Sequence, residues 1–267
     1  VRTAKAQSNS RYTSNRVIGT RGFAMKYASF TNIGKRKRNE DYSYVPPSDG
    51  IPVVMVADGM GGHSAGDIAS RMAVEIIVDE ISKNNDCEDP KFLILNAIRS
   101  ANQKMLEYSQ KDRDCSGMGT TLILAWLFEN HYLAANIGDS RLYHYDGSLL
   151  TQVSVDHTYV GEMLAAGEIT KEQALYHPQR NVITRALGTR RSERTDIFDR
   201  PWKAGDILLL CSDGLNETLD NESIKAILST KADINEMCER LVDKAIRRGS
   251  TDNVTAVLVM NDGGGAL

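Results

Sequence analysis

The chain has 267 residues, a hydrophobic content of 41% and a formal net charge of -3, with 32 Lys and Arg against 35 Asp and Glu. This length allows one large or two small domains, and the balanced charge gives no reason to expect nucleic acid or an anionic membrane as a partner. The four cysteines lie far apart, which argues against a disulfide scaffold or a cysteine zinc site and favours a reducing, cytoplasmic location. No apolar run approaches the roughly 18 residues of a membrane span.

The N-terminal residues 1–22 contain five Arg or Lys and no acid, a composition that predicts a flexible basic arm. Whether this arm is native or added, and whether it marks an organelle transit peptide, stays open. The fold is expected to begin near Phe23, and residues 261–267 are predicted to be a glycine-rich tail. No linker or repeat divides the chain between them, so a single domain over residues 23–260 is predicted.

A strand is predicted over residues 23–30, and a turn then leads into Lys35-Arg36-Lys37-Arg38-Asn39-Glu40-Asp41. This charged run has two interpretations. It is a solvated loop, or its guanidinium groups bind phosphate oxygens while Glu40 and Asp41 hold a cation or its waters.

Strands over residues 42–45 and 51–57 flank a Pro/Gly turn, and a hairpin between them would bring Glu40 and Asp41 close to Asp58. Asp58 comes where the second strand leaves the sheet, and three glycines within four positions follow before a helix over residues 64–81. A carboxylate, a glycine-rich turn and a helix N-terminus suggest a metal or phosphate site. The alternative is an ordinary tight turn with Asp58 as a cap.

The middle of the chain predicts an amphipathic helix after Asp89-Pro90 and then two hairpins, over residues 119–137 and 142–153. Such a meander argues against a doubly wound parallel sheet. Asp139 again follows a strand. Residues 158–188 have less regular spacing and are predicted to be a mobile surface segment that acts as a lid.

The C-terminal part repeats the pattern of an apolar strand followed by an acid at Asp213, and Asp252 lies between a helix over residues 234–246 and a strand over residues 254–260. Carboxylates that converge repel one another unless cations neutralise them. Oxygen ligands without a cluster of Cys or His favour Mg²⁺ or Mn²⁺ over zinc, so the residues predict a two-metal site.

Taken together, the motifs resemble the metal-dependent serine/threonine protein phosphatases of type 2C, in particular the bacterial members. The resemblance covers residues 23–260 and depends on six motifs in the right order. These are Arg36-x-x-Asn39-Glu40-Asp41, Asp58-Gly59-Met60-Gly61-Gly62-His63, Gly117-x-Gly119-Thr120-Thr121, Asn136-x-Gly138-Asp139-Ser140-Arg141, Ser212-Asp213-Gly214-Leu215 and Asp252-Asn253-Val254-Thr255.

This resemblance implies an α+β fold, a four-layer α-β-β-α sandwich of two antiparallel sheets flanked by helices. It implies that Asp58 bridges two Mn²⁺ or Mg²⁺ ions and that Gly59 offers its carbonyl oxygen to one of them. Arg36 would bind the substrate phosphate, and residues 158–188 would form the flap. The remaining implied ligands are Asp213 and Asp252 for the other ion, Glu40 and Asp41 for metal-bound waters, and Asp139 with Asp213 for a third ion.

The chain departs from the family pattern at Met60, where eukaryotic relatives carry a histidine thought to protonate the leaving oxygen. His63 lies three residues further on, and its interpretations are a general acid or a turn or helix-start residue, with metal-bound water as the other proton source. Glu217 either supports the third ion or faces solvent. No chemistry is assigned to His157, His177 or Arg185.

The resemblance implies a hydrolase in signalling that releases phosphate from phosphoserine and phosphothreonine by attack of a hydroxide that bridges two ions. Its partners would be phosphorylated proteins, and it would oppose a serine/threonine kinase. Neither nucleic acid nor a membrane is expected as a partner, and the chain is expected to be a monomer. Two alternatives are a catalytically silent scaffold that binds phosphoproteins and a phosphoesterase that acts on small phosphates.

Overall fold

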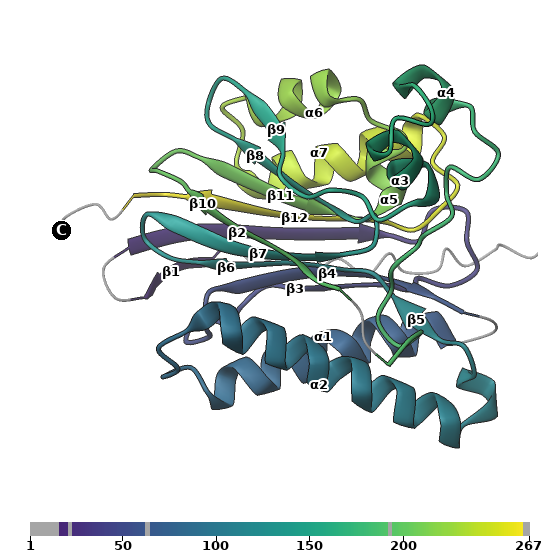
Figure 1. Cartoon of the computed structure of the whole chain (residues 1–267). Helices are drawn as coiled ribbons and strands as arrows, with labels where there is room; N and C mark the ends of the chain where they lie inside the picture. Colours follow the sequence, from purple (N-terminus) through teal and green to yellow (C-terminus); the bar gives the residue numbers. More distant parts are fainter. Residues whose placement is uncertain (1–15, 21–22, 62–64, 192–193, 264–267) are drawn as a thin grey trace, which may run out of the picture.

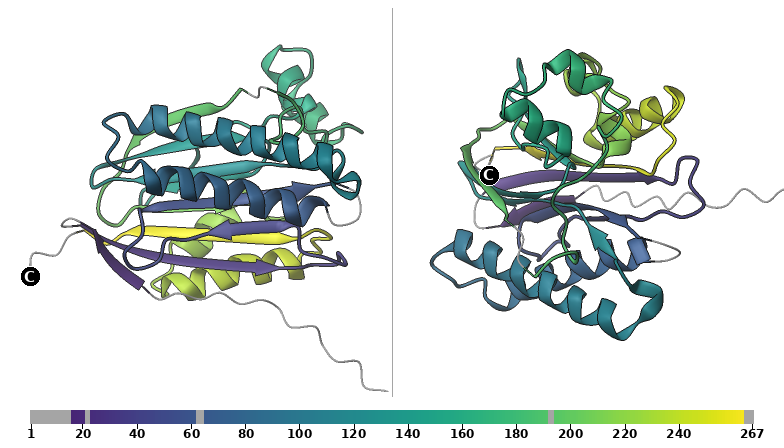
Figure 2. Two further views of the ribbon diagram at one scale, coloured as in Figure 1. Left: turned by 90° about the horizontal axis from the view of Figure 1, so that it is seen from below. Right: turned by 45° about the vertical axis from the view of Figure 1, so that its right-hand side comes forward.

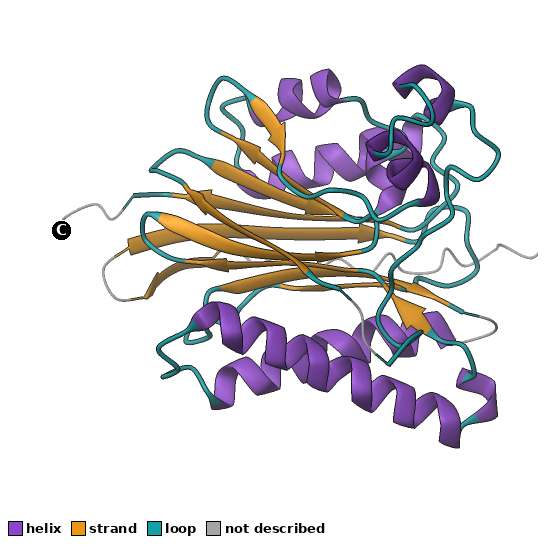
Figure 3. Ribbon diagram, in the orientation of Figure 1, coloured by secondary structure: helices purple, strands orange, loops and turns teal. Residues whose placement is uncertain are grey.

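The structure is a computed structural model that describes residues 16–20, 23–61, 65–191 and 194–263. Two antiparallel sheets lie face to face between two layers of helices, as Figure 1 and the colouring of Figure 3 show. The predicted α+β fold, a four-layer sandwich, is therefore confirmed.

The first sheet has the spatial order β1 (Arg16–Thr20), β2 (Phe23–Asn32), β12 (Val254–Asn261), β11 (Ile207–Cys211), β8 (Arg141–Tyr145) and β9 (Leu150–Gln152). The second has the order β10 (Asp196–Pro201), β7 (His131–Ile137), β6 (Leu122–Leu127), β4 (Val53–Met60) and β3 (Asp41–Tyr44), with β5 (Gly119–Thr120) paired to β4. The predicted hairpin of β3 with β4 is confirmed.

Helices cover the outer faces of both sheets (Figures 1 and 2). On the second sheet lie α1 (Ala65–Lys83) and α2 (Pro90–Lys111), and the short 3-10 turn η1 (Arg113–Cys115) follows them. On the first sheet lie α5 (Asp213–Asn216), α6 (Asn221–Leu228) and α7 (Ile234–Arg247). The flap contributes α3 (Tyr159–Ala165) and α4 (Lys171–Leu175). No helix in the described part of the chain is long and apolar enough to cross a membrane.

Three apolar cores separate the four layers, and the strand period of two assigns side chains to them. In β4, Met55 and Ala57 pack toward α1 and α2, whereas Val54 and Val56 pack between the sheets. In β11, Leu209 packs toward α6 and α7. Because the central strands are buried on both faces, their sequences are nearly continuous apolar runs. In β4 and β11 such a run leads to Asp58 and Asp213.

Several boundaries differ from the sequence prediction. Residues 16–20, assigned to the flexible arm, form the edge strand β1, which pairs with β2. Asp58 and Gly59 lie within β4 rather than in a turn, because the strand continues and pairs with β5. The short helices α5 and α6 were not predicted. The four residues of α5 are too few to show a helical period, whereas α6 buries Ile224, Ile227 and Leu228 at helical spacing and was missed.

The start of α5 packs backbone to backbone on the chain before β12. A Cβ atom added at Gly214 would lie 2.1 Å from the carbonyl oxygen of Asn253. We therefore expect Gly214→Ala to force these segments apart and to cost about 1–3 kcal/mol of unfolding free energy. Thermal unfolding measured by calorimetry should show a fall in Tm of about 3–10 °C.

Gly147 provides the control for this substitution. It has a φ of +90° in a hairpin turn, and nothing lies within 4 Å of an added Cβ atom. Gly147→Ala should therefore cost only the backbone strain of about 1 kcal/mol. Equal losses in the two variants would contradict the packing argument for Gly214.

Candidate active site

Acidic residues from both sheets gather at one end of the sandwich, where β5, α3 and α5 lie in Figure 1. In the second sheet, Asp41 of β3 pairs in register with Asp58 of β4, and Asp139 follows β7. In the first sheet, Asp213 follows β11 and Asp252 precedes β12. The site therefore exists only when the two sheets are packed together.

The centre of the cluster is the pair formed by Asp58 and Asp213. Their carboxyl groups lie close enough for the charge of Asp213 to disfavour ionisation of Asp58. Burial, with the nearby carboxyl groups, raises the pKa of Asp58 well above its usual range and that of Asp213 to about 6. Two carboxylates cannot both ionise in this position unless a cation separates them.

Asp41 connects the two sheets. Its Oδ2 accepts a hydrogen bond of 2.7 Å from Ser212 Oγ, and Ser212 Oγ in turn accepts one of 3.0 Å from the backbone N–H of Thr255. Its Oδ1 is buried without a hydrogen-bond partner. Burial raises the pKa of this carboxyl to about 7. One oxygen is thus fixed in direction while the other is left for a ligand or a water.

Asp139 is held at the same end by a chain of hydroxyl groups. Thr121 Oγ1 accepts from the backbone N–H of Asp58 at 2.9 Å and lies 2.8 Å from Ser140 Oγ, so one threonine joins the Asp58 strand to the Asp139 turn. Burial, together with Asp213 and Asp156, raises the pKa of Asp139 to about 8. This environment is suited to a cation that replaces the proton.

Arg36 lies at the mouth of the cluster, with its side chain 57% exposed, and donates a hydrogen bond of 2.5 Å to Asp252 Oδ2. The loop that carries it is fixed by Asn253, whose Nδ2 donates to the carbonyl oxygens of Ile33 and Arg38 at 2.9 Å each. An exposed guanidinium group is thus held directly over the acids.

Glu40 and Gly59 are tied together at the edge of the cluster. The backbone N–H of Gly59 donates to the carbonyl oxygen of Glu40 at 3.1 Å, and the backbone N–H of Glu40 donates to Asn253 Oδ1 at 2.8 Å. The Glu40 carboxyl lies against Gly66 at the start of α1, and burial raises its pKa. His63 lies outside the described residues, and Met60 ends β4.

Sequence reasoning missed the residues that hold this cluster together. Asn253, Ser212 and Thr121 are each at most 4% exposed and make the hydrogen bonds described above. All three belong to the motifs that carried the family resemblance. For Ser212 and Asn253 the available signal was a polar residue next to an acid and an apolar strand, because such a residue must find a partner when buried.

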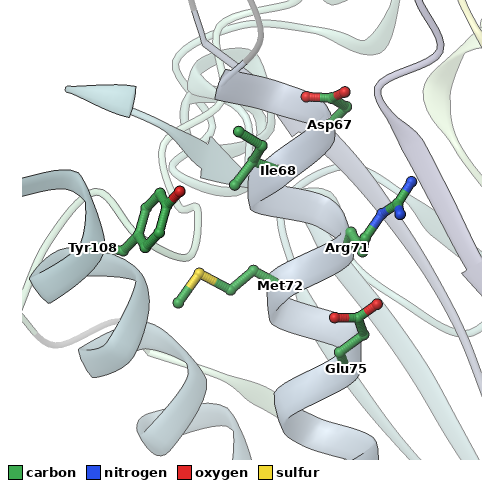
Figure 4. Close-up of a pocket in the computed structure, with 6 residues that line it drawn as sticks. All are labelled: Asp67, Ile68, Arg71, Met72, Glu75 and Tyr108. Carbon is green, nitrogen blue, oxygen red and sulfur yellow. The ribbon is translucent and has the colours of Figure 1, made fainter. Parts of the chain in front are cut away.

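A cavity of about 780 Å³ opens beside the acids, between the flap and α5. Asp139, Asp213 and Glu217 line one wall, and flap residues including Leu164 and Arg180 line another. A second cavity, of about 390 Å³, lies between α1 and α2 and is drawn in Figure 4. Its lining includes Arg71 and Tyr108 but none of the predicted site residues, so it is not part of this site.

The donor set fits hard divalent cations. Several buried carboxyl groups with raised pKa values converge, and Oδ1 of both Asp41 and Asp213 lacks a hydrogen-bond partner. Across the described residues, no three acidic, His or Cys side chains stand close enough to hold an ion as they are. Mg²⁺ binds through one or two carboxylates and several waters, so it does not require three side chains in contact with one ion.

Comparison with known proteins identifies the family. The family model for protein phosphatase 2C matches residues 31–258. The chain belongs to this family. It is a serine/threonine protein phosphatase of type 2C, as the resemblance predicted.

Relatives of this phosphatase match over most of their length. This chain is 39% identical over 231 residues to the serine/threonine phosphatase stp of Listeria monocytogenes, and the match covers 85% of this chain and 92% of that protein. It is 36% identical over 246 residues to protein phosphatase PhpP of Streptococcus pneumoniae, covering 89% of this chain and 98% of that protein.

Solved structures of bacterial phosphatases share the fold. The S. agalactiae serine/threonine phosphatase matches with a TM-score of 0.82 and 33% identity, covering 88% of this chain and 99% of that one. The catalytic domain of PstP in complex with 2 manganese ions matches with a TM-score of 0.78 and 33% identity, covering 88% of this chain and 97% of that one.

The raised pKa of Asp139 makes the stability of the metal-free phosphatase depend on pH. The folded chain keeps a proton at this carboxyl up to about pH 8, whereas the unfolded chain releases it near 3.8. Its contribution to stability is therefore complete below about pH 4 and is lost as the pH rises through about 8. With EDTA present, Tm should fall between about pH 5 and pH 8.

Asp139→Asn is the control, because an amide at this position does not titrate. Its Tm should depend less on pH over the same range, as measured by differential scanning fluorimetry. Identical pH profiles for the wild type and Asp139→Asn would contradict the assignment of the buried proton.

Proposed function

We propose that this phosphatase hydrolyses phosphoserine and phosphothreonine in proteins with two Mn²⁺ or Mg²⁺ ions held at the acidic cluster. The observation that carries the proposal is the convergence of buried and half-buried carboxyl groups from both sheets, one of which pairs with the exposed guanidinium of Arg36. The relative PstP, whose structure contains 2 manganese ions, supports the choice of metal.

In this proposal Asp58 would be a ligand of both ions, the carbonyl oxygen of Gly59 would bind one of them, and Asp213 and Asp252 would hold the other. Glu40 and Asp41 would hold waters, and Asp139 with Asp213 would hold a third ion. When bound, such ions would supply a coordinated water of lowered pKa as the nucleophile.

Residues of the chain itself orient the acids and supply a positive charge for the substrate phosphate. Ser212 fixes one oxygen of Asp41, and Thr121 fixes the strand of Asp58 against the turn of Asp139. The Arg36 guanidinium, whose planar donors match two phosphate oxygens, would bind the substrate phosphate. The exposure of Arg36 allows a phosphate on a protein surface to reach it.

The flap bounds the site on the side where the rest of a protein substrate would lie. The cavity of about 780 Å³ between the flap and α5 gives room for residues that flank the phosphorylated side chain. This favours a protein substrate over a small phosphate. The proposal includes a serine/threonine kinase as the enzyme whose products this phosphatase consumes.

The metal assignment is tested with Asp213→Asn. Hydrolysis of a phosphothreonine peptide should require Mn²⁺ or Mg²⁺, and this variant should lose about 100-fold or more in kcat/KM because a ligand is removed. Phosphate release is the measurement. Asp79→Asn, which removes an exposed acid on α1, should leave the rate unchanged.

Wild-type activity in Asp213→Asn would contradict the assignment. Absence of metal-dependent turnover in the wild type would favour the silent scaffold. A higher kcat/KM for nucleotides than for phosphopeptides would favour the phosphoesterase of small molecules.

Arg36→Ala should weaken phosphate binding with a smaller effect on the chemical step. A charge-assisted hydrogen bond contributes about 1.5–3 kcal/mol, so KM for a phosphothreonine peptide should rise about 10- to 100-fold. Steady-state kinetics with Lys37→Ala as the matched control would check this, because Lys37 is an exposed cation on the same loop. Unchanged KM and kcat in Arg36→Ala would rule out the phosphate-binding role.

A further inference from the structure

The imidazole of His157, which is 3% exposed, packs on the turn that carries Asp139. The backbone N–H of Gly138 donates to His157 Nδ1 at 3.1 Å, and the backbone N–H of His157 donates to the Gly138 carbonyl oxygen at 2.9 Å. His157 also immediately precedes the flap. One residue therefore contacts both the Asp139 turn and the start of the flap.

The other side of the ring contacts the edge of the second sheet. His157 Nε2 lies 3.1 Å from Oδ2 of Asp196, the first residue of β10. Because Nδ1 accepts from Gly138, the neutral ring carries its proton on Nε2 and donates it to Asp196, and Arg185 Nη1 lies 3.0 Å from the same nitrogen. Burial lowers the pKa of His157, which favours this neutral form. Asp196 pairs in register with Asn136 of β7, two residues before Gly138.

The chain segment at the other end of the flap contacts the same carboxylate, that of Asp196. Arg185 Nη1 donates to Asp196 Oδ1 at 3.1 Å, so the two oxygens of Asp196 accept from residues at opposite ends of the flap. The backbone continues this pairing. The N–H of Thr184 donates to the carbonyl oxygen of His157 at 2.9 Å, and Thr158 forms an isolated bridge with Ile183.

These contacts join the two chain segments that enter and leave the flap, which we call the neck. The helices α3 and α4 lie in the chain between these two segments. Beyond the neck, α3 and α4 make few contacts with the sandwich, and the exposed Arg180 lines the cavity beside the acids. The position of that cavity wall therefore depends on the direction in which the neck holds the flap.

We propose that His157, Asp196 and Arg185 form a clasp that positions the flap and the Asp139 turn relative to each other, so that the flap wall of the cavity is aligned with the acidic cluster for phosphoprotein substrates. The clasp residues are positioning residues and do not touch substrate. The part of this proposal that concerns catalysis rests on the proposed function, whereas the part that concerns the neck does not.

The experiment uses two readouts on the full chain. The first is the rate of tryptic cleavage after Arg180 in EDTA, which measures opening of the flap without any activity. The second is the ratio of kcat/KM for a phosphothreonine peptide to that for p-nitrophenyl phosphate, with Mn²⁺ present. The small substrate has no flanking residues to contact the flap, so the ratio isolates the flap contribution.

The variants are His157→Gln, Asp196→Asn and Arg185→Lys, the last two keeping shape or charge in case the first does not fold. Loss of a hydrogen bond to a charged group should speed cleavage after Arg180 about tenfold and lower the ratio about tenfold. Arg185→Lys, which keeps one donor, should show smaller changes in the same direction.

A second histidine–aspartate pair provides matched controls. His144 Nε2 lies 2.9 Å from Asp206 Oδ2, and the other side-chain hydrogen bonds of this pair go to Tyr132 and Lys203, which lie outside the flap. His144→Gln and Asp206→Asn should lower Tm but leave both readouts within about twofold of the wild type. Wild-type cleavage rates and ratios in folded clasp variants, or equal effects in the controls, would overturn the proposal. Failure of metal-dependent turnover would remove only the second readout.

Discussion

Repulsion between buried carboxyl groups at one end of the sandwich is the constraint that the rest of the site satisfies. Asp213 and Asp41 both disfavour ionisation of Asp58, and Asp41 and Asp139 are buried. Each charge is costly in this environment unless a proton or a cation compensates it. The ion pair of Arg36 with Asp252 is one such compensation.

The sandwich is the means by which these charges are brought together. Asp41, Asp58 and Asp139 come from one sheet, and Asp213 and Asp252 come from the other. The apolar core between the sheets stabilises the arrangement, while Ser212 and Asn253 provide hydrogen bonds across it. A shift of one sheet along the other would therefore separate the acids as well as disturb the core.

The same end of the molecule also carries the flap, and the two are connected through the Gly138–Asp139 turn. Asp139 faces the acidic cluster, and Gly138 contacts His157 at the neck of the flap. One turn therefore contacts both the acidic cluster and the residue that precedes the flap.

The sequence by itself determined the elements and the candidate acids. Apolar runs identified the buried strands, and helical periods identified α2 and α7. An acid after a predicted strand marked Asp58, Asp139 and Asp213. These signals could be read from the sequence because each depends on residues close together in the chain. Extension of β4 through Asp58 and Gly59 was missed, since it depends on pairing with β5. The edge strand β1 was missed because its polar, basic sequence pairs only where β2 offers an edge.

Only the tertiary structure decided which polar residues support the acids. Asn253 meets residues more than 200 positions away, Thr121 joins Asp58 to Ser140, and His157, which had no assigned chemistry, meets Asp196. A hydrogen bond of this kind is set by the relative position of two sheets and a loop. No local pattern records it, because the same side chain has different partners in different folds.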